Sequence, residues 1–141
     1  MSIYQGLTNS FKREMLQAGQ NIITNTLYMA LYTSYSDIGP ETTVYTATNE
    51  VTGTGYTAGG RQVTGATLNT DVDTGTVYVN FNNVSWPGAS FTARGALIYN
   101  VTSNNKSVLV LDFGSDKNFN SINNTVTMPA NTATTALIRF P

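Results

Sequence analysis

The chain has 141 residues, which suffice for one domain with a sizeable hydrophobic core and are too few for two. Charged residues make up 11% of it, against about a quarter in ordinary soluble proteins, and the formal net charge is -1. It has no cysteine and no histidine, which excludes disulfides, thiolate zinc sites, cysteine nucleophiles and histidine-based triads. A polar surface with so little charge gives weak repulsion between copies, which is a first indication of a component of an assembly; a neutral, soluble β domain is the alternative.

The charge pattern and hydropathy also bear on partners. Seven basic and eight acidic residues are spread without clusters, which argues against a nucleic-acid partner. No apolar run approaches the roughly 18 residues of a membrane span, so we expect no membrane partner. The N-terminus lacks the basic-then-apolar order of a secretory signal, so we expect synthesis in a reducing cytoplasm.

Residues 1–24 differ from the rest of the chain and are predicted to form an N-terminal helical arm. Apolar residues recur there at spacings of three and four, as on one face of a helix; they are Tyr4, Leu7, Phe11, Met15, Ala18 and Ile22. Ser2 or Ser10 could cap the helix. The helix either covers one face of a sheet or docks on a partner subunit, and in the second case Tyr4, Leu7, Phe11 and Met15 would contact the partner.

The segment after the first strong strand, 27–33, is rich in turn residues. Gly39-Pro40 breaks the pattern, 43–46 can be a short strand, and 53–60 resembles a flexible exposed loop of the kind that often carries contacts. Tyr45 and Tyr56 in this segment are therefore further candidates for partner binding.

Residues 25–141 are predicted to form one all-β domain. The stretch 86–99 holds the only tryptophan and then a strand with apolar groups on both faces, which predicts a central position. Phe91, Ala93, Leu97 and Tyr99 are expected to share one face, and Ala96 and Ile98 the other. Further strands are predicted at 61–68, 76–81, 84–86, 107–113, 125–128 and 136–140, with a polar connection at 114–124. Many short strands separated by turns indicate an antiparallel β-sandwich, jelly-roll or immunoglobulin-like, with one N-terminal helix.

The motifs that could carry chemistry are weak. Glycines at 53, 55 and 59 fit neither the dinucleotide-binding fingerprint nor the Walker phosphate-binding pattern. Asp112-Phe113-Gly114 matches the magnesium motif of protein kinases, but the chain has no histidine for the catalytic loop and is too small for that fold. Asp71 with Asp73, and Asp112 with Asp116, offer too few oxygen ligands for a calcium site. We expect no catalytic residue, no metal and no cofactor. Trp86, Tyr45 and Tyr56 could stack on a sugar ring, although buried aromatics are commoner in a small β core.

Five blocks in order along residues 25–140 resemble a group of small virion structural proteins of tailed bacteriophages. The blocks are Met29-Ala30-Leu31-Tyr32-Thr33, Tyr56-Thr57-Ala58-Gly59-Gly60, Val84-Ser85-Trp86-Pro87-Gly88, Ala93-Arg94-Gly95-Ala96-Leu97-Ile98-Tyr99 and Leu111-Asp112-Phe113-Gly114-Ser115-Asp116. The resemblance implies a non-enzymatic β-rich component of the virion with no catalytic motif.

Together these observations favour a capsid decoration or cement protein that binds the major capsid protein and forms a homo-oligomer, possibly a trimer. A tail, baseplate or head-to-tail joint protein is the alternative from the same group. A host-surface carbohydrate-binding module on the virion is the alternative from another class.

Overall fold

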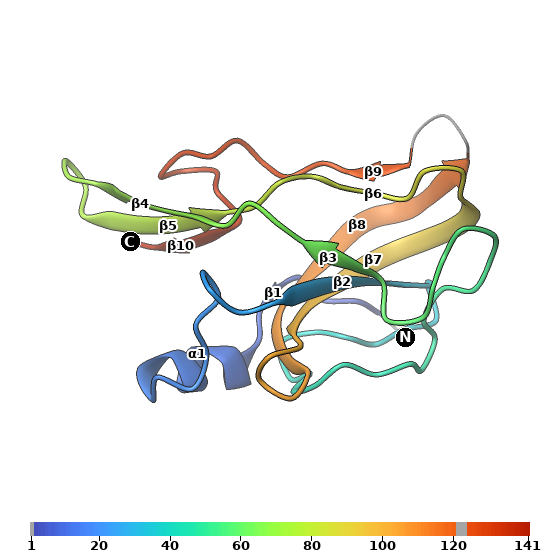
Figure 1. Ribbon diagram of the computed structural model, residues 1–141, viewed down its shortest axis with the longest axis horizontal. Coiled ribbons are helices and arrows are strands. Elements are labelled where there is room, and N and C mark those ends of the chain that lie inside the picture. Colours follow the sequence, from blue (N-terminus) through green and yellow to red (C-terminus); the bar gives the residue numbers. More distant parts are fainter. Residues whose placement is uncertain (1, 121–123) are drawn as a thin grey trace.

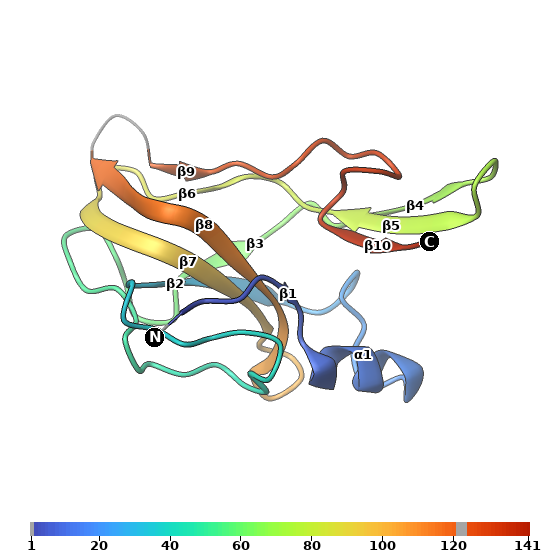
Figure 2. The same cartoon turned by 180° about the vertical axis from the view of Figure 1, so that it is seen from behind.

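The computed structural model describes residues 2–120 and 124–141, which form antiparallel β-sheets and one short α-helix (Figure 1). The predicted all-β, sandwich-like fold with an N-terminal helix is confirmed. Met1 of the predicted arm and residues 121–123 of the predicted 114–124 connection lie outside the described residues. The molecule is elongated, with the largest sheet towards one end and the β4–β5 hairpin projecting at the other (Figure 2).

The larger sheet has five strands in the order β1-β8-β7-β2-β3, and neighbouring strands run antiparallel. The middle of this sheet is buried on both faces, over residues 95–100 of β7 and 107–110 of β8, as is typical of runs of apolar residues without alternation. The strands are β1 (Gly6–Leu7), β2 (Leu27–Tyr32), β3 (Arg61–Val63), β7 (Ser90–Asn100) and β8 (Lys106–Asn120).

Two smaller sheets lie across from it. One has the order β10-β5-β4 and the other pairs β6 with β9. Their strands are β4 (Thr67–Asp71), β5 (Thr76–Asn80), β6 (Val84–Ser85), β9 (Thr125–Val126) and β10 (Ile138–Phe140). The predicted strand 61–68 is therefore split between β3 and β4, with Gly65 in a left-handed conformation between them.

Both faces of the five-stranded sheet are buried. One face packs against the smaller sheets and the helix, with Met29, Ile98 and Phe119 among its fully or almost fully buried residues. The other face carries Tyr32, Leu97 and Val110 and is covered by Ile3 and Ile38, from the N-terminal segment and the 33–60 loop. Trp86 is 1% exposed and lies against Phe119, so its role is in the core.

The expected division of the β7 side chains between faces is partly wrong. Leu97 and Tyr99 do face away from Ala96 and Ile98, but Phe91 and Ala93 lie in the same cluster as Ala96 and Ile98. The pairing with β8 shifts between Ala93 and Gly95. Between these two pairs β7 advances by two residues, from Ala93 to Gly95, and β8 by five, from Asp112 to Lys117. Such an irregularity interrupts the alternation of faces, which explains why Ala93 and Ala96 lie on the same side.

The predicted N-terminal helix is much shorter than its apolar stripe. Only α1 (Asn9–Leu16) is helical, and Thr8, not Ser2 or Ser10, is the N-cap. Gly6 and Leu7 pair instead with Val110 and Leu109 of β8. The helix ends at Leu16 with Gln17 as its C-cap; Ala18 then has a left-handed φ of 55°, and the Gly19 amide donates to the Glu14 carbonyl at 2.7 Å.

Two further expectations differ from the structure. The prediction of a polar connection at 114–124 is wrong for residues 114–120, which belong to β8. The strand continues there because Gly114 adopts a left-handed conformation and the pairing with β7 shifts its register. The short strand at 43–46 is reduced to a single bridge between Val44 and Lys106.

Candidate functional site

The 41–60 loop is held to the five-stranded sheet by a buried glutamate. Glu50 is 9% exposed and accepts hydrogen bonds from the hydroxyls of Tyr45 and Tyr56, both at 2.5 Å, and from the Gly59 amide at 2.8 Å. The Tyr56 hydroxyl also accepts a hydrogen bond from the Leu31 amide of β2. The sequence predicts a flexible glycine-rich loop here, but the hydrogen bonds to the Glu50 carboxylate hold the middle of this loop in one conformation.

Two more tyrosines complete this cluster. The Tyr32 hydroxyl donates to the Thr46 carbonyl at 2.6 Å, and the Tyr99 hydroxyl donates to the Gly59 carbonyl at 2.6 Å. The Tyr45 ring stacks on the Tyr99 ring with centroids 4.8 Å apart. We refer to Glu50 with Tyr32, Tyr45, Tyr56 and Tyr99 as the tyrosine cluster.

Burial and the nearby carboxylate oppose ionisation of these phenols. Desolvation, followed by the Glu50 charge, raises the pKa of Tyr99 to about 12. The pKa values of Tyr32, Tyr45 and Tyr56 are also raised above the ordinary value of 10.0, first by desolvation and then by hydrogen bonding to, or the charge of, Glu50. The phenols therefore remain protonated donors at neutral pH, which suits a structural latch.

Two of the residues predicted to bind a partner belong to this cluster. Tyr45 and Tyr56 are half-buried, and both hydroxyls are used by Glu50. The Tyr56 ring also lies against Phe91, with centroids 5.4 Å apart. In this conformation these side chains hold the loop, and neither presents a free ring and hydroxyl to a sugar.

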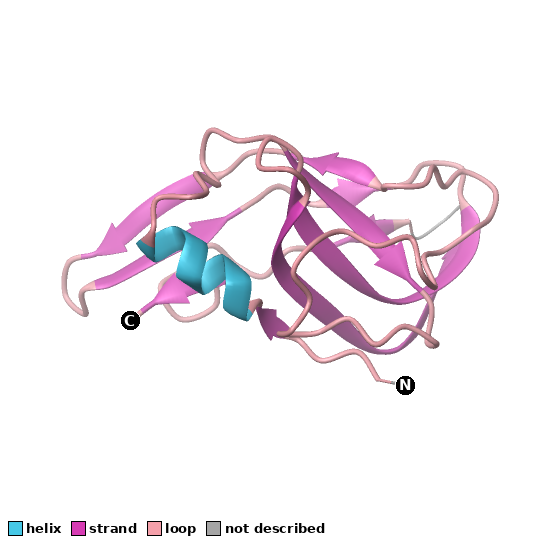
Figure 3. Cartoon of the chain, turned by 90° about the horizontal axis from the view of Figure 1, so that it is seen from below, coloured by secondary structure: helices cyan, strands magenta, loops and turns pink. Residues whose placement is uncertain are grey.

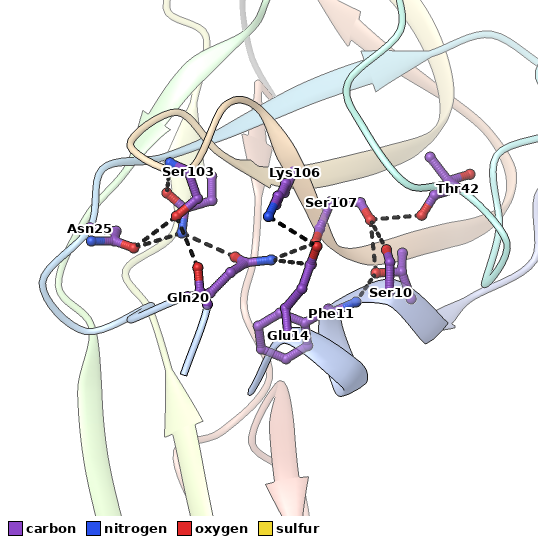
Figure 4. A network of polar contacts seen from close by, with 12 residues as sticks. Ser10, Phe11, Glu14, Gln20, Asn25, Thr42, Ser103, Lys106 and Ser107 are labelled. Carbon is purple, nitrogen blue, oxygen red and sulfur yellow. Dashed lines mark hydrogen bonds and ion pairs between the residues drawn. The ribbon is translucent and has the colours of Figure 1, made fainter. Parts of the chain in front are cut away.

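The N-terminal segment is joined to the sheet by a network of polar contacts (Figure 4). Ser107 at the start of β8 is fully buried and donates to the Thr42 carbonyl at 2.7 Å; its hydroxyl also contacts Thr8 and Ser10. Gln20 donates to Glu14 at 3.0 Å and accepts from the buried Asn100 at 3.0 Å. The N-terminal segment, through α1 and Gln20 after it, is therefore hydrogen-bonded to both ends of the β7–β8 turn and to the 39–43 loop.

The four candidate residues of the predicted arm lie in different surroundings. Phe11 is 0% exposed within the core, and Leu7 and Met15 are half-buried against it. Tyr4 is 64% exposed, and its amide donates to the Ile38 carbonyl at 3.0 Å. Of the four, Tyr4 presents the most surface to a partner, and Phe11 presents none in this conformation.

An apolar groove that the sequence pattern does not indicate lies between α1 and the β10-β5-β4 sheet. Figure 3 shows these two elements from below. The volume of the groove is about 430 Å³, and its apolar walls include Met15, Ile22, Ile23, Leu68, Val77 and Phe140. Leu68 is 58% exposed and Phe140 40%. The alternation in β4 and β10 could have indicated this face, but the alternating residues there are too few to define a pattern.

The carboxylates considered for metal binding have local roles. Asp71 accepts from the Asp73 amide in the β4–β5 turn, and Asp112 accepts from the Gly114 amide. Asp116 pairs with Arg94 at 3.0 Å. Among residues 2–120 and 124–141, no three His, Cys, Asp or Glu side chains gather as metal ligands would. In the same residues no helix has the length and apolar character needed to cross a membrane.

No family model, no curated protein and no solved structure matches this chain.

Proposed function

We propose that the chain is a non-enzymatic structural protein of a tailed-bacteriophage virion, and specifically a capsid decoration protein that binds the head lattice. Its support comes from the five ordered sequence blocks between residues 25 and 140 and from the nearly uncharged polar composition. Such a surface favours close packing against other protein.

The observation that carries the proposal is a pair of exposed tyrosines, one on the N-terminal segment and one on the 33–39 loop that this segment contacts. Tyr4 is 64% exposed and is held by a backbone hydrogen bond to Ile38. Tyr35, on the same 33–39 loop as Ile38, is 74% exposed. Tyrosines that lie on a fixed backbone lose little side-chain entropy on binding, which is why they are enriched at protein interfaces. We assign Tyr4 and Tyr35 as the contact with the head lattice.

The first experiment is mass spectrometry of purified particles, with copy number measured against the major capsid protein. Hundreds of copies in each particle would support a decoration protein. A dozen or fewer would place the chain in the tail, the baseplate or the head-to-tail joint. Absence from the particle would overturn the virion proposal.

The second experiment tests the surface itself. Particles lacking the protein are mixed with purified wild-type chain or with Tyr4→Ala/Tyr35→Ala, and bound protein is measured by co-sedimentation. We expect the double variant to bind at least about tenfold more weakly, because two exposed aromatic contacts are lost. Val101→Ala, which truncates an exposed apolar residue in the β7–β8 turn, is the matched control and should bind normally. Equal binding of the wild type and the double variant would rule out this surface.

A further inference from the structure

The apolar groove lies between two projecting elements that differ in charge. One is α1, and the other is the β4–β5 hairpin with β10 beside it; both project at the same end of the molecule (Figures 1 and 3). Each carries an exposed aliphatic side chain near its tip: Leu16 at the end of α1 is 91% exposed, and Val72 in the hairpin turn is 87% exposed. Exposed apolar side chains on the elements that form the walls of an apolar groove are typical of a protein interface.

The sheet contributes one continuous apolar face to this groove. Leu68 is directly opposite Val79, and Val79 is opposite Ile138, so the three share a face of the sheet. Val77 and Phe140 extend the same face towards the hairpin tip. Val79 and Ile138 are buried by the core, whereas Leu68 and Phe140 remain substantially exposed. The groove is therefore the part of this sheet face that the core leaves uncovered, next to the part that Val79 and Ile138 bury in the core.

The two elements that flank the groove carry exposed charges of opposite sign, although none of these charged residues lines the groove itself. Lys12 is exposed and lies one turn before Leu16, on the same side of α1. Asp73 is exposed in the hairpin turn next to Val72. Neither makes an ion pair with any residue in the described part of the chain, whereas Glu14 of α1 is paired with Lys106. The helix therefore offers an unpaired cation and the hairpin an unpaired anion.

We propose that the groove is the interface of a homodimer, in which the hairpin of each chain covers the groove of the other and contacts its α1. The groove and the hairpin that would cover the partner's groove lie on the same face of one chain. A two-fold symmetric interface requires this, because both chains use the same surface. Val72 of one chain would lie near Leu16 of the other, and Asp73 near Lys12, twice in each dimer. This contact does not depend on the virion assignment, and it leaves Tyr4 and Tyr35 free for another partner.

The first test measures mass in solution by light scattering and sedimentation over a range of concentrations. We expect the wild type to have twice the mass of the chain and Leu68→Asp to dissociate about a hundredfold more readily, because a charge would be buried in the apolar groove. Circular dichroism checks that the variant is folded, as expected for a residue 58% exposed. A wild-type monomer at every concentration, or a trimer, would overturn the proposal.

The second test separates this interface from non-specific association. Lys12→Glu and Asp73→Lys should each weaken the dimer about tenfold, because like charges then meet at both copies of the contact. Mixing the two variants should restore wild-type affinity, since every contact in the mixed dimer again joins opposite charges. Asp37→Lys changes an exposed acid outside the groove and is the control. A dimer that survives both charge reversals, or one that mixing does not restore, would show that copies associate elsewhere.

Discussion

At the scale of single residues, the clearest feature is Glu50, whose carboxylate joins three parts of the 41–60 loop to β2 and β7. Its two oxygens accept three hydrogen bonds, from Tyr45, Tyr56 and Gly59. A carboxylate suits this position because it only accepts, and every group facing it donates.

We therefore predict that Glu50→Gln lowers the free energy of unfolding by about 1 to 3 kcal/mol. Whichever way the amide turns, its nitrogen replaces one acceptor, so at least one buried phenol or amide loses its partner. Urea unfolding followed by fluorescence measures the change. Glu41→Gln, an exposed carboxylate that accepts from Asn9, is the control and should change stability by less than about 0.5 kcal/mol. Equal effects of the two changes would show that Glu50 does not hold the loop.

The sequence could not have shown this role for Glu50. Its partners lie five, six and nine residues away in a segment without regular periodicity, where Tyr45 and Tyr56 read as exposed aromatics. The carboxylate becomes their common acceptor only after the loop has folded back over β2. Burial of Trp86, by contrast, follows from its place in a strongly apolar stretch and was expected.

At the scale of elements, the positions of strands with a strong run of apolar residues were predicted well, and those of strands interrupted by glycine or polar residues were not. β2, β5 and β7 lie where their apolar residues indicate. The extension of β8 to Asn120 was missed because Gly114 and the polar residues after it resemble a turn. α1 was overestimated because Tyr4 and Leu7 continue the helical spacing although Leu7 pairs with Leu109 of β8. Tertiary pairing overrides local periodicity in both cases.

The short helix gives a matched pair of substitutions. Phe11→Ala should lower the free energy of unfolding by about 3 to 5 kcal/mol, since it removes a fully buried ring from the core. Leu16→Ala on the same helix should change it by less than about 0.5 kcal/mol, because Leu16 is 91% exposed. Thermal and urea unfolding of monomeric samples would measure both. If the Phe11 variant were as stable as the wild type, α1 would be a detachable arm and not part of the core.

At the scale of the whole molecule, the surfaces proposed for different partners lie apart. Tyr4 and Tyr35 lie with the N-terminal segment and the 33–39 loop, whereas the apolar groove lies between α1 and the β4–β5 hairpin. The groove belongs to elements that pack on one face of the five-stranded sheet, whereas Ile3 and Ile38, the neighbours of these tyrosines in the chain, pack on the other face. A component that uses one surface for a copy of itself and another for a lattice can bridge neighbouring positions, so stability of the intervening sheet matters for function.

That stability should fall at alkaline pH because of the tyrosine cluster. In the unfolded chain the phenols release their protons near pH 10.0, whereas burial and the Glu50 charge raise the pKa of Tyr99 to about 12 in the folded protein. Below about pH 10 both states are protonated and Tyr99 adds no pH dependence; above it the unfolded state binds fewer protons, so the free energy of unfolding decreases as pH rises.

We predict a decrease of up to about 1.4 kcal/mol per pH unit from Tyr99 between about pH 10 and 12, with further decreases from Tyr32 and Tyr56, whose pKa values are also raised. Urea unfolding at several pH values measures the slope.

Tyr99→Phe should reduce the slope by the contribution of one phenol, because the ring that stacks on Tyr45 remains and only the titrating hydroxyl is lost. Tyr35→Phe, at a 74% exposed position, should leave the slope as in the wild type. A wild-type stability that stays level through this range would contradict the burial of these phenols beside a charged Glu50.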